Sequence, residues 1–231
     1  MRIACTLSTD FEDSQFGLPY RAFREAGHDV VVVGAQPGEE MEGLHGEEKA
    51  EVALGIEFAH PDEFDALFIP GGYSPDHLRA DPRFLEFTRA FADANKPLLA
   101  ICHGPQLLSS ADAIRGRRLT AWRTVQQDLE RMGERVTDAD LVVDGQLVTS
   151  RQPADLDGFI IESLRILSGM PAIPPPRPGD PTGVPGPDDP RLPDEPDPRL
   201  PERDPEPAPH FRPIPDPRFP GTAPIPEPLP F

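Results

Sequence analysis

The sequence predicts an α/β fold, in which a mostly parallel β-sheet carries helices on both faces, followed by a separate proline-rich tail. Three observations predict it. Short apolar runs alternate with amphipathic segments along residues 1–170. Residues 30–33 are four consecutive valines, which is typical of a strand buried on both faces. Only nine of the 33 prolines precede Pro171, so we expect a folded domain over 1–170 and a tail over 171–231.

Glycines and prolines set the expected boundaries in the first half of the domain. Gly27 stands where a helix commonly ends, because glycine readily adopts the left-handed backbone of a helix C-terminus. Gly71 and Gly72 follow Pro70 and close the third strand. The expected segments are a strand over residues 2–7, a loop over 8–14, a helix to residue 26, a strand over 28–34 and a strand over 66–69.

The second half of the domain opens with a helix that Asp81 caps and Pro82 starts. Phe84, Phe87 and Phe91 then recur at helical spacing, which predicts one buried face. The remaining expected segments are a strand over residues 98–101, a helix from 104, a helix over 124–132, a hairpin over 141–148 with an Asp-Gly turn, and a helix over 154–167.

Charge and composition exclude several classes of function. The formal net charge is −18, and a surface this negative repels phosphate backbones and anionic lipid. We therefore expect no nucleic-acid partner and no membrane partner. The first residues lack the apolar run of a signal peptide, and two cysteines make no disulfide framework. The expected location is the cytoplasm, with reduced thiols.

The proline-rich tail repeats a short motif. Asp-Pro-Arg-Leu-Pro occurs at residues 189–193 and 197–201, and Asp-Pro-Arg-Phe-Pro at 216–220. Proline at this density removes backbone donors and disfavours helix, so we expect disorder rich in polyproline II. The tail is then a solvated extension or a docking peptide for an aromatic-lined groove, and the sequence names no partner for it.

Parallel sheets bind ligands beyond the carboxyl ends of their strands, so the loops at 8–14, 71–76 and 102–105 are the expected site. Cys102 stands between a buried strand and a helix, the context of a nucleophile elbow. The turn projects the sulfur, and the helix N-terminus favours the thiolate, the reactive form of cysteine. Cys5 lies within a strand and is expected to be an unreactive core residue.

The sequence predicts no metal and no cofactor. His28, His45 and His60 lie in separate elements without ligand spacing, and His210 lies in the tail. There is no Gly-x-Gly-x-x-Gly motif and no Walker-type loop for a nucleotide.

Four segments carry a resemblance to a known family. They are Ala-Ile-Cys-His-Gly-Pro-Gln at residues 100–106, Asp-Phe-Glu-Asp at 10–13, the strand and glycine pair at 64–72, and the entry to the last helix at 150–156. Together they resemble the PfpI-type intracellular proteases, relatives of the Parkinson-associated deglycase. The likeness runs in register over about residues 1–167 and implies a flavodoxin-like sandwich of the glutamine-amidotransferase-like superfamily.

The resemblance implies a role for each matching residue around the nucleophile Cys102. Glu12 matches the acid that hydrogen-bonds the sulfur; the alternative is an acid at a helix N-terminus. Gly71 and Gly72 match a turn whose N–H groups face the nucleophile. With the amide of His103 they would stabilise an oxyanion, and the alternative is a plain tight turn.

His103 is the expected base, since it is the only histidine close to Cys102 in sequence. In the family, an acid from a neighbouring subunit orients this histidine. Asp76 matches that acid, although other members carry the longer Glu, and it could instead cap a helix. The resemblance therefore implies a homodimer or higher homo-oligomer in which Asp76 is supplied across the interface.

The leading functional hypothesis is a stress-protective enzyme in which the Cys102 thiolate attacks an electrophilic carbon. Its substrate is a small reactive dicarbonyl or its protein adduct, turned over by glyoxalase or deglycase chemistry, or a peptide, hydrolysed through a thioester. A non-enzymatic redox sensor is a second class. A glutamine amidotransferase is a weaker alternative, since the body has no downstream His-x-Glu pair. An inert binding module, with the tail as its active part, is a further alternative.

Overall fold

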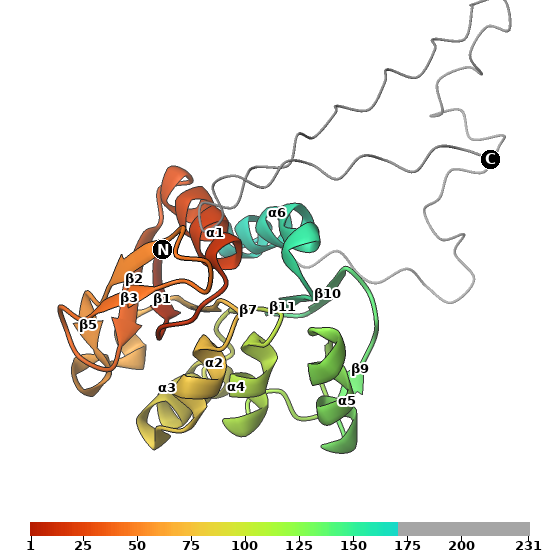
Figure 1. Cartoon of the computed structure of the whole chain (residues 1–231). Helices are drawn as coiled ribbons and strands as arrows, with labels where there is room; N and C mark the ends of the chain where they lie inside the picture. Colours follow the sequence, from red (N-terminus) through yellow and green to blue (C-terminus); the bar gives the residue numbers. More distant parts are fainter. Residues whose placement is uncertain (171–231) are drawn as a thin grey trace, which may run out of the picture. The chain divides into compact units, whose positions relative to one another are not determined.

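The computed structural model describes residues 1–170 (Figure 1). The expected proline-rich tail at 171–231 lies outside the described residues. No helix within the described part has the length and hydropathy needed to span a membrane.

The strands are β1 (Arg2–Thr6), β2 (Asp29–Gly34), β3 (Glu40–Glu42), β4 (Lys49–Glu51), β5 (Leu54–Gly55), β6 (Ala66–Ile69), β7 (Leu98–Ile101), β8 (Arg118–Leu119), β9 (Arg135–Val136), β10 (Leu141–Asp144) and β11 (Leu147–Ser150). The α-helices are α1 (Asp13–Glu25), α2 (Ser74–Arg79), α3 (Pro82–Asp93), α4 (Gly104–Ser110), α5 (Arg123–Arg131) and α6 (Leu156–Leu167). Three short 3₁₀ turns are η1 (Ile56–Phe58), η2 (Pro61–Glu63) and η3 (Pro153–Asp155).

Seven strands form the main sheet, in the order β10-β11-β7-β6-β1-β2-β5. Every neighbouring pair is parallel except β10 with β11. Strand β1 lies between β6 and β2, with Ile3 paired to Val30 of β2 and to Ala66 of β6. The predicted parallel α/β sheet is therefore confirmed.

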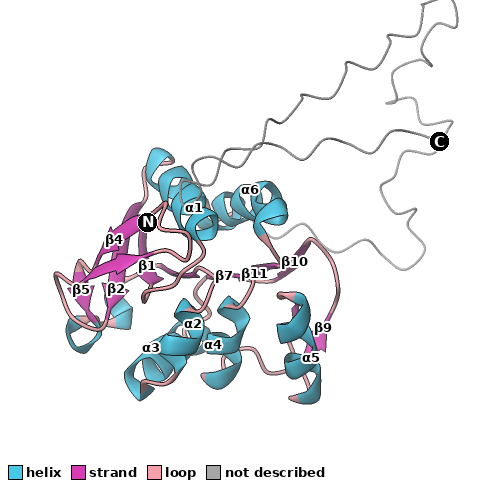
Figure 2. Cartoon of the chain, in the orientation of Figure 1, coloured by secondary structure: helices cyan, strands magenta, loops and turns pink. Residues whose placement is uncertain are grey.

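Helices cover both faces of this sheet. Figures 1 and 2 show α1 and α6 on one side and α2, α3, α4 and α5 on the other. Because successive side chains of a strand point to opposite faces, each strand contributes to two cores. In β7, Leu98 and Ala100 join the core beneath α3 and α4, whereas Leu99 and Ile101 join the core beneath α1 and α6. Burial on both faces explains why these strands are almost entirely apolar.

The structure adds elements that the sequence analysis did not predict. Helix α2 fills part of the expected loop at 71–76, and Asp76 lies within its first turn. Strands β3 and β4 form a small antiparallel pair of three residues each. Helix α1 begins at Asp13, within the loop expected at 8–14. These elements are short or polar, so they lack the long apolar periodicity on which the prediction rests.

Candidate active site

Three neighbouring strands end at one place on the rim of the sheet. Glu12 follows β1, the Gly71–Gly72 turn follows β6, and Cys102 follows β7. Cys102 has a φ of 60°, a left-handed backbone conformation that a non-glycine residue rarely adopts. Such a conformation costs about 1–3 kcal/mol and needs support from its surroundings. The strained turn predicted for a nucleophile elbow is thus present at Cys102.

The glycine turn lies directly against this cysteine. A Cβ on Gly71 would collide with the Gln15 Oε1 atom and lie 2.7 Å from the Cys102 Cβ atom. Gly72 has a φ of +77°, and a Cβ there would meet the backbone of Asp10 and Glu12. Both positions therefore require glycine. The close approach lets the Gly72 N–H, together with the His103 N–H, donate to the Cys102 sulfur.

His103 supplies a base beside the sulfur. Its Nδ1 atom lies 3.2 Å from the Cys102 Sγ atom. Burial lowers the pKa of His103 below its ordinary 6.5, although the charge of Asp76 opposes this shift. The ring is therefore neutral at pH 7 and can accept a proton. In the tautomer that carries its hydrogen on Nε2, the Nδ1 atom is free to take the proton from the thiol.

The expectation of a preformed thiolate is wrong. Burial raises the pKa of Cys102 to about 11, because the charged sulfur loses its hydration. The Gln15 side chain and the amides of Gly72 and His103 lower it only in part, and the negative charge of Glu12 raises it further. The resting pair is thus a thiol beside a neutral imidazole, and the thiolate forms as the proton moves to His103.

Glu12 has no hydrogen bond to the sulfur among the described residues, and its predicted role at Cys102 stays a prediction. Its Oε2 atom accepts hydrogen bonds of 2.7 Å from the Gln15 N–H and the Ser14 hydroxyl, so it caps α1. The side chain of this helix that lowers the pKa of Cys102 is Gln15, one helical turn later, and neither of its polar atoms has a hydrogen-bond partner among residues 1–170. Helix α1 starts at Asp13, and this phase turns position 15 toward Cys102.

Asp76 is placed near the base but does not contact it within this chain. Its Oδ1 atom accepts from the Arg79 Nε atom at 2.8 Å, and the two side chains form an ion pair. The carboxylate is more than half exposed. The predicted role of a partner's Asp76 at His103 stays a prediction.

A cavity of about 350 Å³ opens over the sulfur. Cys102 is 7% exposed, so the nucleophile is reached only through this cavity. His103 lies between two aromatic rings, with ring centroids 6.4 Å from Tyr73 and 6.5 Å from Trp122. Leu44, Tyr73 and Trp122 of this cavity were not predicted from the sequence. All three are exposed large hydrophobic side chains, and their exposure follows from the fold and not from the sequence pattern. The lining residues are Glu12, Gln15, Leu44, Gly72, Tyr73, Cys102, His103, Trp122 and Pro153.

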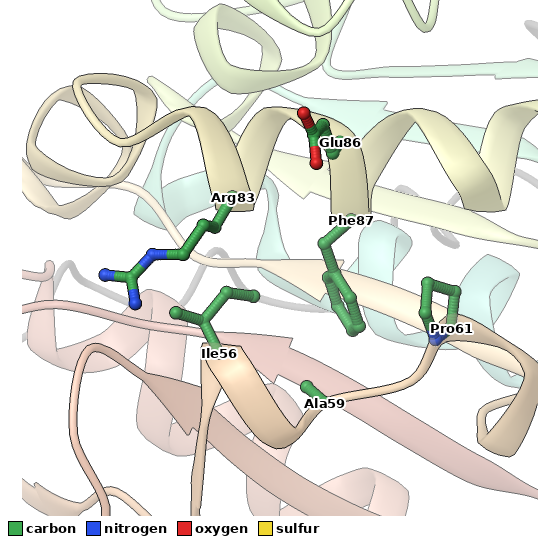
Figure 3. A pocket seen from close by; sticks show the side chains of 6 residues that line it. All are labelled: Ile56, Ala59, Pro61, Arg83, Glu86 and Phe87. Carbon is green, nitrogen blue, oxygen red and sulfur yellow. The ribbon is translucent and has the colours of Figure 1, made fainter.

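A second hollow lies away from the sulfur, between α3 and the segment around η1. Figure 3 shows the Phe87 ring facing Ile56, Ala59 and Pro61, with Arg83 at one end. Arg83 is already paired with Asp81 at 2.6 Å. Its lining residues include one carboxylate, Glu86, but neither a cysteine nor a histidine, so it is not the candidate active site. Among residues 1–170, no group of three His, Cys, Asp or Glu side chains is arranged to hold a metal ion.

Comparisons with known proteins agree with this geometry. The chain is 49% identical over 167 residues to the Escherichia coli "Protein/nucleic acid deglycase 2", covering 72% of this chain and 97% of that protein. It is 46% identical over 167 residues to Bacillus subtilis "General stress protein 18", with the same two coverages. It is 44% identical over 166 residues to "Putative cysteine protease YraA" of the same organism, covering 72% and 98%.

Solved structures give the same result. A two-domain Anabaena variabilis protein with DJ-1/ThiJ/PfpI-like and ferritin-like domains superposes with a TM-score of 0.71 at 34% identity, over 74% of this chain. The present chain spans half of that protein's length. Drosophila melanogaster DJ-1beta shares the fold, with a TM-score of 0.67 at 23% identity over 73% of this chain and 90% of its own. The profile of the DJ-1/PfpI family matches residues 1–166, and the chain belongs to that family.

Proposed function

We propose that the protein is a cysteine-dependent enzyme that converts small reactive dicarbonyls, or the adducts they form on amino groups, to hydroxy acids. The observation that carries this proposal is the pairing of the Cys102 Sγ atom with the His103 Nδ1 atom at 3.2 Å. The pair lies at the base of a cavity with a volume of about 350 Å³, large enough for a small molecule.

The first step is addition of the thiol to an aldehyde carbon. The Sγ–C bond forms as the C=O double bond opens, and the thiol proton passes to His103. The amides of Gly72 and His103, which already point at the sulfur, lie next to the developing oxyanion. The oxygen then takes the proton back, which gives a hemithioacetal.

The second stage moves hydrogen within the bound substrate. His103 removes the C–H proton of the hemithioacetal carbon, and the electron pair shifts to give an enediol. Reprotonation at the neighbouring carbon gives a thioester of a 2-hydroxy acid. Water cleaves the C–S bond and restores the thiol. For methylglyoxal the balance is one dicarbonyl plus one water to one lactate, with no external oxidant or reductant.

Relatives with enzyme names support an enzyme activity for this chain. The relative named "Protein/nucleic acid deglycase 2", at 49% identity, favours dicarbonyl adducts as the substrates of this chain. The protease name of another relative supports peptide hydrolysis as the second candidate. A readily oxidised redox sensor fits less well, because a thiol with a pKa of about 11 is mostly protonated at neutral pH.

The test is consumption of methylglyoxal and formation of lactate, measured beside hydrolysis of a fluorescent casein. We expect lactate from the wild-type protein and a loss of at least about 10³-fold in Cys102→Ser. Cys5→Ala is the matched control, since it removes the other thiol and should keep the activity. Casein hydrolysis without lactate would favour the peptidase, and equal lactate from wild type and Cys102→Ser would end the proposal.

The same proposal includes assembly of two copies. The carboxylate of Asp76 is exposed and bound only to Arg79 on its own helix, so it is available to a second chain. Analytical ultracentrifugation should give a dimer or a higher oligomer. A monomer that retains full activity would exclude a cross-subunit role for Asp76.

A further inference from the structure

A second cavity adjoins the one that holds the sulfur. Its volume is about 360 Å³, and it shares Trp122 with the sulfur cavity. Gln152 of this cavity is followed in the chain by Pro153 of the other. The lining residues are Trp122, Arg123, Gln126, Asp138, Arg151 and Gln152.

Contacts around Trp122 fix the position of the second cavity relative to the sulfur cavity. The Trp122 N–H donates to the Cys102 carbonyl at 2.9 Å, which ties the wall between the cavities to the nucleophile. Its indole stacks on the His103 ring at an interplanar angle of 27°. The Gln126 Nε2 atom donates to the Ala121 carbonyl at 2.8 Å and fixes the segment from the other side. A group in the second cavity therefore has a defined position relative to the sulfur.

The two arginines of this cavity differ in their pairing. Arg151 forms ion pairs with Asp138, Asp140 and Asp155, so its charge is more than balanced. Arg123, by contrast, has no hydrogen bond or ion pair from its side chain within residues 1–170. Its charge lowers the pKa of Asp138, although the Arg151 hydrogen bond lowers it more. Arg123 thus offers free guanidinium donors at the cavity.

We propose that this second cavity is a carboxylate subsite, in which Arg123 binds an acid group of the substrate while the dicarbonyl carbon lies at Cys102. The planar guanidinium matches a carboxylate with two parallel hydrogen bonds. The net charge of −18 repels polyanions, so a single carboxylate on a small molecule suits one unpaired cation better than a nucleic acid does. The substrate class is a dicarbonyl adduct of an amino acid or of a peptide C-terminus. The reaction at Cys102 in this inference rests on the proposed function, whereas the binding of a carboxylate by Arg123 does not.

The chain contains one tryptophan, so the fluorescence of Trp122 reports directly on this subsite. The probes are N-acetylarginine and N-acetylargininamide, which differ only in the carboxylate. We expect about tenfold tighter binding of the carboxylate probe by wild type, and no preference in Arg123→Gln. Arg123→Lys should restore part of the preference. Arg131→Gln is the matched control, because Arg131 lies at the other end of α5 and pairs with Asp128.

The methylglyoxal adducts of the same two probes give the second readout. Wild type should convert the adduct of N-acetylarginine with a kcat/KM about tenfold higher than that for the adduct of N-acetylargininamide, and the difference should lie in KM. Arg123→Gln should abolish this difference. Equal binding of both probes by wild type would overturn the subsite. A carboxylate preference in binding that depends on Arg123 would uphold the subsite even if no adduct were turned over; that combination would count only against the proposed function.

Discussion

The two cysteines of this protein have the same side chain but different surroundings, because one lies within a strand and the other follows a strand. Cys5 lies within β1, paired on both sides by β2 and β6, and is fully buried. Cys102 follows β7 on an adjacent part of the same sheet and is 7% exposed. Burial raises the pKa of both thiols, but nothing offsets it at Cys5, whereas three hydrogen-bond donors oppose it at Cys102.

The difference arises at the end of a strand. Inside β1 the backbone groups pair with neighbouring strands, so none is left to face the sulfur. After β7 the chain turns through a positive φ at Cys102, and amides from this turn and from the glycine turn converge on the side chain. Activation therefore needs a base and donors that a strand interior cannot offer. Three of the following predictions each remove the base or one donor, and one compares the two thiols in the native protein.

The largest effect should follow from loss of the base. His103→Ala leaves the buried thiol of Cys102 with no neighbouring acceptor for its proton, so it would resemble Cys5. We expect lactate formation to fall about 10³-fold. In wild type, activity should fall as the pH drops through the lowered pKa of His103, below 6.5, because imidazolium accepts no proton.

Initial rates between pH 4.5 and 9 would check this prediction. The His103→Ala variant should lack the acidic limb. A profile that keeps the same limb without His103 would assign it to another group.

The next effect compares the two thiols in one experiment. Native protein treated with iodoacetamide should be alkylated at Cys102 about 10²-fold faster than at Cys5, or more, because Cys5 is exposed only when the core opens. Peptide mass spectrometry over time measures both sites. In urea the two rates should converge. Faster labelling of Cys5 in native protein would refute the assignment of reactivity to the end of the strand.

The residues that could be predicted from sequence are those whose position in a strand or turn fixes their role. The apolar run of β7 followed by Cys102 and His103 predicts the neighbouring thiol and imidazole, and the glycine pair predicts a turn close to them. The ionisation of Cys102 could not be predicted, because desolvation depends on side chains brought from other strands and outweighs the helix N-terminus. The position of Gln15 could not be predicted, because the residue at which α1 begins decides whether position 12 or position 15 faces the sulfur.

The glycine turn should have a moderate effect. Gly72→Ala places a Cβ against the backbone of Asp10 and Glu12 and strains a φ of +77°. We expect a loss of about 2 kcal/mol in unfolding free energy and a matching fall in kcat as the amide moves from the sulfur. Gly27→Ala is the control, since it has a positive φ but open space around its Cβ and lies away from the site. Equal kcat in wild type and Gly72→Ala would show that this amide is not used.

The smallest effect concerns the side-chain donor that the sequence did not reveal. Gln15 is fully buried, and neither polar atom of its carboxamide has a hydrogen-bond partner among the described residues, although the group lies close enough to the sulfur to lower the pKa of Cys102. Gln15→Leu keeps the volume and removes that donor, so the thiolate loses one hydrogen bond of about 1.4 kcal/mol and kcat should fall about tenfold. The pKa of Cys102 should rise, seen as slower alkylation at fixed pH. Stability should not fall, because leucine removes a buried polar group that is poorly satisfied. A variant that unfolds more readily but reacts at the wild-type rate would assign Gln15 to packing rather than to the sulfur.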